Sequence, residues 1–190
     1  MKTDNAKAKE KIFQAVLELV ESEENIENIT TRQIANKANV NLALINYYYQ
    51  SKENLMSQVA EIKMTSIINQ LLGRSNLNVD ASARLKELLT ATADFSFKYN
   101  HIFKIAVARE LKEGCKNSCS LVMPFLKEIF KNENELELRI VALQMMVPFH
   151  QIVLYPEAYK NYLHTDFFDE KQRTHMINKM VDSILHETGE

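Results

Sequence analysis

Residues 30–55 have the sequence TTRQIANKANVNLALINYYYQSKENL, and this stretch decides the fold of the chain. A helix is expected to begin at Thr30 or Thr31, because threonine is a good helix N-cap. Apolar residues at helical spacing give this helix one buried face: Ile34, Ala35 and Ala38. The stretch therefore opens with a short amphipathic helix.

The helical pattern breaks at Asn39-Val40-Asn41, because asparagine tolerates the left-handed backbone that a sharp helix exit needs. A second short helix is expected over 42–49, with Leu44 and Ile45 facing inward. Ser51 can then cap a third helix. Two helices joined by so short a turn fit a helix-turn-helix, whose second helix can lie in the DNA major groove.

The composition favours an all-helical protein. The chain has 190 residues, of which 46% are hydrophobic, with only three glycines and three prolines. So few turn-forming residues are typical of helical proteins. The sequence contains no uninterrupted apolar run of about 18 residues, and the start, MKTDNAKAKEK, has no apolar segment of a secretory signal. We therefore expect a cytoplasmic protein that does not contact a membrane.

Two cysteines, Cys115 and Cys119, have the i, i+4 spacing that places side chains on one face of a helix. A redox pair or a soft-metal site is one interpretation, but two ligands are too few for a closed zinc site. Cysteine commonly packs as a small hydrophobe, and a reducing compartment keeps it as a thiol. We expect neither a metal ion nor a cofactor, and a redox role of the two thiols stays open.

The formal net charge of −2 argues against a protein that coats nucleic acid through its overall charge. A specific DNA-binding protein needs only one positive face. Basic residues gather at the start of the chain and around the helix-turn-helix: Lys2, Lys7, Lys9, Lys11, Arg32, Lys37 and Lys52. Acidic residues follow and are expected to face away from them: Glu18, Glu21, Glu23, Glu24 and Glu27.

The rest of the sequence predicts further helices. The first runs over 4–22, and another begins after Ser51 and extends toward 72 before a stop at Gly73. Five more are expected in the second half: 80–99, 101–112, 118–131, 132 or 134 to 155, and 169–187. Pro124 is expected near the first turn of its helix. Pro148 is expected inside a helix, which it would kink or split, and Pro156 is expected at a helix exit.

Residues 7–60 resemble the N-terminal DNA-binding domain of the TetR family of transcriptional regulators. The family pattern combines an Ile-x-x-Ala helix, Thr-Thr, Ile-Ala, Ala-Gly-Val-Ser, an aromatic cluster and Ser-Lys-Glu-x-Leu. The matching residues are Ile12 with Ala15, Thr30-Thr31, Ile34-Ala35, Ala38 to Asn41, Tyr47 to Tyr49, and Ser51-Lys52-Glu53 with Leu55. The chain departs from the pattern at three asparagines, where Asn39 replaces a glycine, Asn41 a serine and Asn46 a frequent tyrosine.

The resemblance implies an all-α fold of about nine helices, with a three-helix DNA-binding domain over 1–55 and a helical effector-binding and dimerisation domain over 56–190. It implies a homodimer whose two recognition helices enter successive major grooves of a pseudo-palindromic, double-stranded operator. A small-molecule effector bound in the second domain would release this repressor from the operator. The dimer interface is expected near 141–155 and 171–185, as a four-helix arrangement.

The resemblance also places nine residues at the DNA: Thr31, Arg32, Asn41, Leu42, Ala43, Asn46, Tyr47, Tyr48 and Lys52. Thr31 and Arg32 begin a helix, where a hydroxyl and a guanidinium suit a phosphate, although Thr31 can equally be a cap. The hydroxyls of Tyr47 and Tyr48 and the cation of Lys52 also suit phosphates. A solvated lysine is the alternative for Lys52.

Base recognition is expected from the second helix of the pair. Asn46 can form two hydrogen bonds with an adenine edge, while Leu42 and Ala43 can touch thymine methyl groups. Tyr49 lies at an inward-facing position of the same helix and is expected in the core.

The second domain is rich in aromatic and methionine side chains, which can line an adaptable apolar pocket or form ordinary core. The candidate effector-binding residues are Phe95, Tyr99, His101, Phe103, Met123, Phe125, Met145, Phe149 and His150. The two histidines would supply polar contacts. This composition favours a hydrophobic or aromatic effector.

Two other functions were open at the level of sequence. The chain can be a DNA-binding dimer that uses its second domain only to dimerise or to bind a protein partner. It can also be a helical di-iron enzyme, but that site needs Glu-x-x-His on two helices, and each of the five histidines lacks the glutamate. Three scattered glycines cannot form a phosphate-binding loop either. We therefore expect no enzyme, whereas repression and activation are not distinguished.

Overall fold

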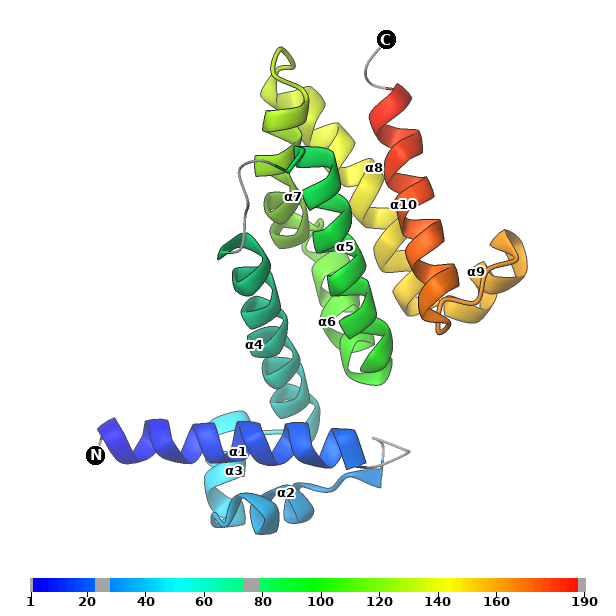
Figure 1. Ribbon diagram of the computed structural model, residues 1–190. Helices are drawn as coiled ribbons and strands as arrows, with labels where there is room; N and C mark the ends of the chain where they lie inside the picture. Colours follow the sequence, from blue (N-terminus) through cyan, green and yellow to red (C-terminus); the bar gives the residue numbers. More distant parts are fainter. Residues whose placement is uncertain (1, 23–27, 74–78, 188–190) are drawn as a thin grey trace. The chain divides into compact units, whose positions relative to one another are not determined.

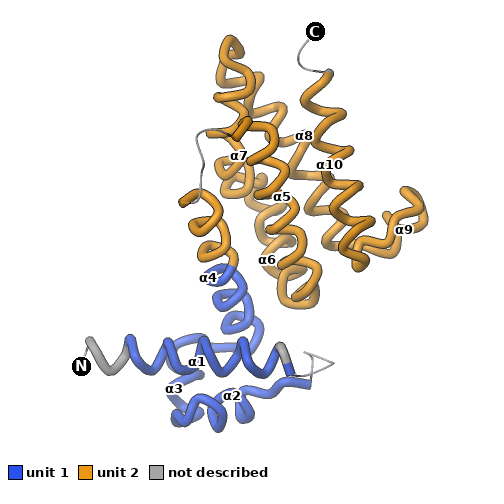
Figure 2. Tube along the Cα trace, viewed as in Figure 1, with its two compact units in different colours: residues 1–63 blue, residues 64–190 orange. Residues whose placement is uncertain are grey.

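The computed structural model describes residues 2–22, 28–73 and 79–187, which form ten α-helices and no β-strand (Figure 1). The expected all-α fold is confirmed, with ten helices instead of about nine. The chain divides into two compact units, Met1–Lys63 and Met64–Glu190, called unit 1 and unit 2 below (Figure 2). The division lies inside a helix, further along the chain than the expected boundary after residue 55.

Unit 1 consists of three helices and the first part of a fourth: α1 (Lys2–Ser22), α2 (Thr31–Ala38), α3 (Leu42–Tyr49) and α4 (Lys52–Gly73). α1 packs against α2, and α2 packs against α3. The centre is filled by fully buried branched side chains: Ile12, Val16, Ile29, Ile34, Ile45 and Leu55. Burial of each such side chain stabilises the fold by about 1.5–3 kcal/mol, so this core fixes how α2 and α3 are oriented.

Unit 2 contains the rest of α4 and six further helices: α5 (Ala81–Lys98), α6 (Asn100–Lys112), α7 (Lys116–Ile129), α8 (Glu135–Leu154), α9 (Pro156–Leu163) and α10 (Glu170–Glu187). α8 is central, because it packs against α6, α7, α9 and α10 (Figure 1). α5 in turn packs against α7 and α10. The core between these helices includes Leu85, Leu88, Val122, Leu126, Ala142 and Val181.

α8 is long and apolar enough, by length and composition alone, to cross a membrane (mean hydropathy 1.2). Core helices of globular proteins meet the same test. Eight residues of α8 are buried in unit 2: Leu138, Val141, Ala142, Met145, Met146, His150, Ile152 and Val153. The central position of α8 in unit 2 therefore accounts for its apolar composition.

Two prolines lie inside helices. Pro148 is within α8, as expected, and α8 runs unbroken from Glu135 to Leu154, so of the two expected effects, a kink or a split, the split is wrong. An interior proline costs about 3 kcal/mol, and packing of α8 against four other helices offsets this cost. Pro124 is also interior, because it is the ninth residue of α7, which begins at Lys116. The expectation of a first-turn proline there is wrong.

α9 is the helix that the sequence pattern did not reveal. Pro156 was expected to mark an exit only, but it also stands at the first turn of α9, where a missing N–H costs nothing. The helix has eight residues and ends at His164, which adopts a left-handed conformation (φ 50°). A helix this short shows too few turns for its periodicity to be recognised.

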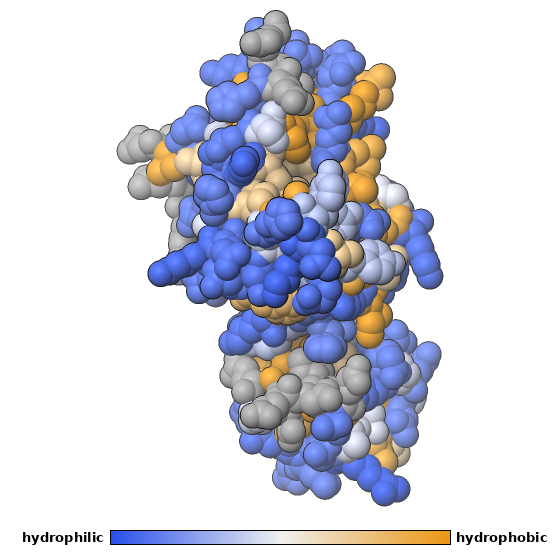
Figure 3. All heavy atoms as spheres, turned by 90° about the vertical axis from the view of Figure 1, so that its right-hand side faces the viewer, coloured by the Kyte–Doolittle hydropathy of each residue, from blue (hydrophilic) through white to orange (hydrophobic). Residues whose placement is uncertain are grey.

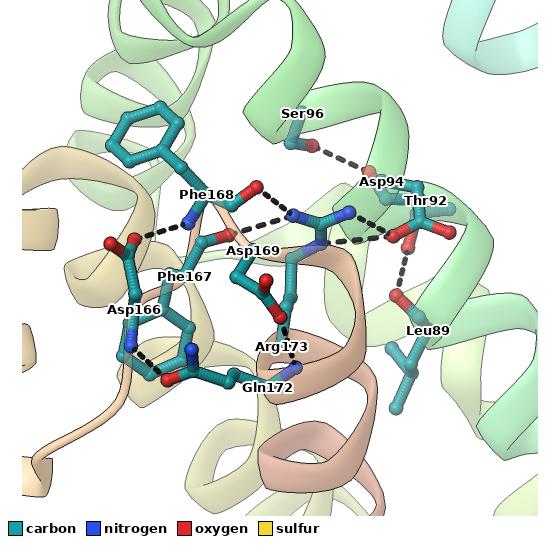
Figure 4. Close-up of polar contacts among 10 residues, drawn as sticks. All are labelled: Leu89, Thr92, Asp94, Ser96, Asp166, Phe167, Phe168, Asp169, Gln172 and Arg173. Atoms are coloured by element: carbon teal, nitrogen blue, oxygen red, sulfur yellow. Dashed lines mark hydrogen bonds and ion pairs between the residues drawn. The ribbon is translucent and has the colours of Figure 1, made fainter.

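Arg173 joins α10 to α5 and to the segment that precedes α10 (Figure 4). This residue is 5% exposed. Its Nε donates to Oδ1 of Asp94 at 2.9 Å, and its Nη1 donates to the carbonyl oxygen of Phe167 at 2.7 Å. The guanidinium also lies 5.5 Å from the ring centroid of Phe97. Since a buried cation is tolerated only when it is paired and hydrogen-bonded, these contacts hold α5, α10 and the connecting segment in one arrangement.

We predict that Arg173→Ala lowers the free energy of unfolding by about 2–3 kcal/mol, because Asp94 and a buried carbonyl group lose their partner. Urea unfolding followed by circular dichroism measures this change. Lys37→Ala is the control, since Lys37 pairs with Glu18 on an exposed surface and should change stability by about 0.5 kcal/mol or less. Equal effects of the two substitutions would contradict the role assigned to Arg173.

Candidate nucleic-acid interface

The start of α2 is fixed by a capping box between Thr30 and Gln33. The backbone N–H of Gln33 donates to Oγ1 of Thr30 at 3.2 Å, and the backbone N–H of Thr30 donates to Oε1 of Gln33 at 2.7 Å. Thr30 is therefore the N-cap, and Thr31 is the first residue of α2. Arg32 follows it and is exposed. Both expected phosphate-binding residues thus lie in the first turn of a helix, where backbone N–H groups favour anions.

The turn between α2 and α3 has the expected left-handed residue. Asn39 adopts φ 51° and ψ 52°, and the N–H of Val40 donates to the carbonyl of Ala35 at 3.0 Å. Asn41 is the N-cap of α3, and its Oδ1 accepts from the N–H of Ala43 at 2.8 Å. The Asn41 side chain was expected at the DNA. Its Oδ1 is engaged in the helix cap, whereas its amide N–H groups can still donate to DNA.

The faces of α3 separate core residues from exposed ones. Ile45 and Tyr49 are buried, which confirms the core position expected of Tyr49, and burial raises the pKa of its phenol. Of the candidate DNA-binding residues on α3, Ala43, Asn46 and Tyr47 are exposed, whereas Leu42 and Tyr48 are half-buried. α3 therefore presents a narrow face of three exposed side chains, and Tyr47 is 78% exposed.

Lys9 on α1 lies over the ring of Tyr48, with Nζ 5.2 Å from the centroid. The Tyr48 ring also meets Tyr47 edge-on, at a centroid distance of 5.4 Å. The sequence places Lys9 in a basic cluster but gives no sign of this pairing, because the two residues lie far apart in the chain. The contact brings a cation of α1 to the side of α3.

α4 begins at Lys52 after a serine cap, since the N–H of Asn54 donates to Oγ of Ser51 at 3.1 Å. Lys52 is half-buried in this first turn. Glu53 is beside it, and hydrogen bonds from its own backbone N–H and from the Ser51 hydroxyl lower the pKa of its carboxyl. The expected capped start of α4 is confirmed.

One charge of the expected positive face is neutralised. Lys37 of α2 pairs with Glu18 of α1 at 2.9 Å, so the expectation that Glu18 faces away from the basic residues is wrong. The contact between α1 and α2, which the sequence alone does not reveal, brings the two charges together. Of the other charged residues of that expectation, Glu23, Glu24 and Glu27 lie outside the described residues, and the side chains of Lys2 and Glu21 are not described.

In unit 2, three of the candidate effector-binding residues form an aromatic cluster. The rings of Phe95 and Tyr99 are 4.7 Å apart and those of Phe95 and Phe103 are 5.2 Å apart, each in an edge-on arrangement. All three side chains are buried. His101, at the start of α6, is exposed instead. Phe125 belongs to the apolar core of unit 2.

His150 is buried and contacts Cys115, with Nδ1 3.5 Å from Sγ. Burial lowers the pKa of the imidazole and raises the pKa of the Cys115 thiol. Burial also raises the pKa of Cys119 to about 11, and the charge of Glu110 adds to this effect. Thiols with raised pKa values are poor nucleophiles at neutral pH. This environment supports a packing role for both cysteines.

A small apolar pocket lies between α5, α8 and α10. Its lining consists of Leu89, Met145, Phe149, Ile177, Met180, Val181 and Ile184. Met145 and Phe149 were candidates for effector binding, whereas Met123 is half-buried against the core instead. The other lining residues were missed, although those from α10 belong to an amphipathic stripe that the sequence displays.

A comparison with protein families finds one match, and it lies within unit 1. The family model described as "Bacterial regulatory proteins, tetR family" matches residues 20–59. No curated protein matches the chain.

Solved structures of regulators cover nearly the whole chain. FadR of Thermus thermophilus, a TetR-family repressor crystallised with lauroyl-CoA, has a TM-score of 0.64 at 15% identity, over 90% of this chain and 92% of its own. A TetR regulator of Haloarcula marismortui has a TM-score of 0.62 at 11% identity, over 96% and 98%. FadR of Bacillus halodurans, a fatty acid degradation regulator, has a TM-score of 0.58 at 17% identity, over 94% of both chains.

The family match covers the two short helices, the left-handed turn and the capped start of α4. The solved structures are too different in sequence to show more than a shared fold, and this shared fold includes unit 2. Residues 20–59, which hold the helix-turn-helix, match the TetR family model, and the whole chain shares the fold of solved TetR-family regulators.

Proposed function

We propose that this regulator is a homodimeric, cytoplasmic repressor that binds a pseudo-palindromic operator and is released by a small apolar or aromatic effector bound in unit 2. The exposed face of α3 carries this proposal. A second helix of a helix-turn-helix that leaves Ala43, Asn46 and Tyr47 exposed is suited to enter a major groove. No catalytic role, cofactor or metal is proposed.

The nine candidate residues divide into two groups by their chemistry. Thr31, Arg32, Tyr47, Tyr48 and Lys52 would contact phosphates and so set the position of the helix-turn-helix on the duplex. The others would contact base edges: Asn41, Leu42, Ala43 and Asn46. The first-turn positions of Thr31, Arg32 and Lys52 support the phosphate role, because helix N-termini attract anions.

An exposed apolar stripe on α8 supports dimerisation. Leu136, Ile140 and Leu143 follow the i, i+4, i+7 spacing and are 66%, 41% and 43% exposed. Methionine and isoleucine side chains of the adjacent α10, Met180 and Ile184, are half-buried. Figure 3, which views the side of the molecule that includes α10, shows apolar surface on unit 2. A second copy that covers α8 and α10 would complete a four-helix interface, which on α8 would begin at Leu136, before the 141–155 expected from the sequence.

The apolar lining of unit 2 supports a hydrophobic effector. The pocket between α5, α8 and α10 includes Met145 and Phe149 and has no charged residue in its lining. The Thermus thermophilus structure contains lauroyl-CoA, a ligand with a long apolar chain. An effector of this kind would bind one conformation of unit 2 more tightly and shift the population away from the operator-binding form. The alternative is an effector-independent dimer that responds to a protein partner.

We predict that the protein binds the intergenic DNA beside its own gene and that Asn46→Ala and Tyr47→Ala each weaken this binding about tenfold or more, since they remove contacts of α3. A gel-shift titration at fixed salt measures the affinity. Asn161→Ala and Tyr162→Ala remove the same side-chain types from an exposed part of unit 2 and should change nothing. Absence of specific binding to this DNA, or equal losses in the controls, would overturn the proposed site.

For the dimer, we predict that the native protein has about twice the chain's 22.0 kDa in light scattering coupled to size-exclusion chromatography. The double substitution Ile140→Glu and Leu143→Glu should yield monomers, because it places two charges in an apolar interface. Ile105→Glu on α6 is the control, since Ile105 is also exposed (43%) but lies outside the stripe. A native monomer, or dimers in both variants, would refute this interface.

For the effector, we predict that saturating lauroyl-CoA raises the unfolding temperature by about 5 °C and weakens operator binding, because a ligand that binds only the folded state stabilises it. Phe149→Ala should reduce both effects, whereas Phe168→Ala, a half-exposed phenylalanine outside the pocket, should not. A regulator that responds neither to lauroyl-CoA nor to free lauric acid would favour the alternative with a protein partner.

A further inference from the structure

The recognition helix has no charged side chain. α3 has the sequence LALINYYY, and its N-cap is another neutral residue, Asn41. Asn46 is the only residue of α3 whose side chain has a donor atom, Nδ2, and a separate acceptor atom, Oδ1, side by side. The three tyrosines add hydroxyl groups at the other end of the helix. The set of base pairs that α3 can distinguish is correspondingly narrow.

α3 lacks the side chains that usually recognise guanine and cytosine. A specific guanine contact is usually made by two parallel donors of an arginine, or by a lysine, to O6 and N7, and cytosine is read by a carboxylate that accepts from N4. α3 contains none of these residue types. Asn41 is the N-cap and not part of α3, and its Oδ1 accepts from the N–H of Ala43 at 2.8 Å, so its carboxamide retains only N–H donors and does not offer the paired donor and acceptor of a free amide.

Adenine and thymine, in contrast, match the exposed face. The Asn46 amide is exposed and has the donor and acceptor that fit N7 and N6 of adenine. Leu42 and Ala43 lie in the first turn of α3, the part of a recognition helix that contacts base edges. Their aliphatic groups suit the 5-methyl group of thymine, which projects into the major groove.

The cations of unit 1 lie beside α3 and not on it. Arg32, the only arginine in residues 1–63, stands in the first turn of α2. Lys9 reaches over the Tyr48 ring from α1, and Lys37 is paired with Glu18. Cations at the edges of a recognition helix meet phosphates, whose contacts are independent of base sequence.

We propose that α3 reads A·T base pairs alone, with Asn46 on adenine and Leu42 and Ala43 on thymine methyl groups, so that the operator half-site has A·T pairs at every position that α3 contacts. This inference rests on the proposed operator binding and adds to it the base composition of the site. It also makes thymine methyl groups part of the affinity.

The test begins with in vitro selection from a library of random duplexes, carried out in parallel with the native protein and with Asn46→Ala. Positions whose base preference weakens in the variant are those that Asn46 reads, and their neighbours lie under α3. We expect A·T pairs at these positions. Failure to select any specific duplex would overturn operator binding itself, whereas a specific consensus with G·C pairs at these positions would overturn only the A·T reading.

Two substitutions in the selected duplex then test the chemistry by fluorescence anisotropy. Replacement of the half-site thymines by deoxyuridine removes only the methyl groups, and replacement of adenine by 7-deazaadenine removes the N7 acceptor. Each should weaken binding by the native protein roughly fivefold or more. The loss from 7-deazaadenine should disappear in Asn46→Ala, while the loss from deoxyuridine should persist. Unchanged binding to either duplex would refute the corresponding contact.

Asn46→Arg provides a gain-of-preference arm. An arginine at this exposed position supplies the two donors that guanine requires, so the variant should select a guanine where the native protein selects adenine. Asn161→Arg adds the same charge to an exposed site in unit 2 and should leave the consensus unchanged. An Asn46→Arg variant that binds specifically and retains the native consensus would show that residue 46 does not read a base.

Discussion

The fold of unit 1 depends on one turn of three residues, in which Asn39 adopts the left-handed conformation and Asn41 begins the next helix. A left-handed residue costs about 1 kcal/mol for most amino acids, and asparagine reduces this cost. The turn leaves little unpaired backbone, because the N–H groups of Val40 and Ala43 both have acceptors. With the chain reversed in so few residues, Ile34 of α2 and Ile45 of α3 are buried in one core. Burial of Ile45 then determines which side chains of α3 remain exposed.

Unit 2 relies on a different kind of constraint, a buried cation. Arg173 carries a charge into a region where it must be fully hydrogen-bonded, and its partners come from α5 and from the segment before α10. Apolar packing alone is non-directional, so it would permit α10 to slide along α5. The directional contacts of Arg173 fix the register of α10, and with it the positions of Met180 and Ile184 beside the exposed stripe of α8.

The helix-turn-helix could be predicted from sequence because its signals are local. The capping threonines, the asparagine turn and the apolar spacing of α2 and α3 all lie within residues 30–55 and agree with one another. What failed was non-local or atypical. α8 is not split at Pro148, because helices distant in the sequence pack against it, and α9 is too short to show a period. The pocket of unit 2 combines residues from three helices, which no pattern along the chain connects. The contacts of Lys9 with Tyr48 and of Lys37 with Glu18 likewise depend on tertiary packing.

The separation of charge from base contact in unit 1 has a consequence for specificity. When cations of a protein bind DNA phosphates, counterions are released from the DNA into solution. Their release is less favourable at higher salt, so cation–phosphate contacts weaken as the salt concentration rises. Contacts of neutral side chains with base edges depend much less on salt. Here the cations are on α1, α2 and α4, while α3 is neutral. With a formal net charge of −2, only cations within about one Debye length of the duplex, roughly 8 Å at physiological ionic strength, can favour binding. Added salt should therefore weaken the phosphate contacts, on which non-specific binding depends, and leave the base contacts of α3 in place. The affinity for all DNA should fall, while the ratio of operator affinity to non-specific affinity persists.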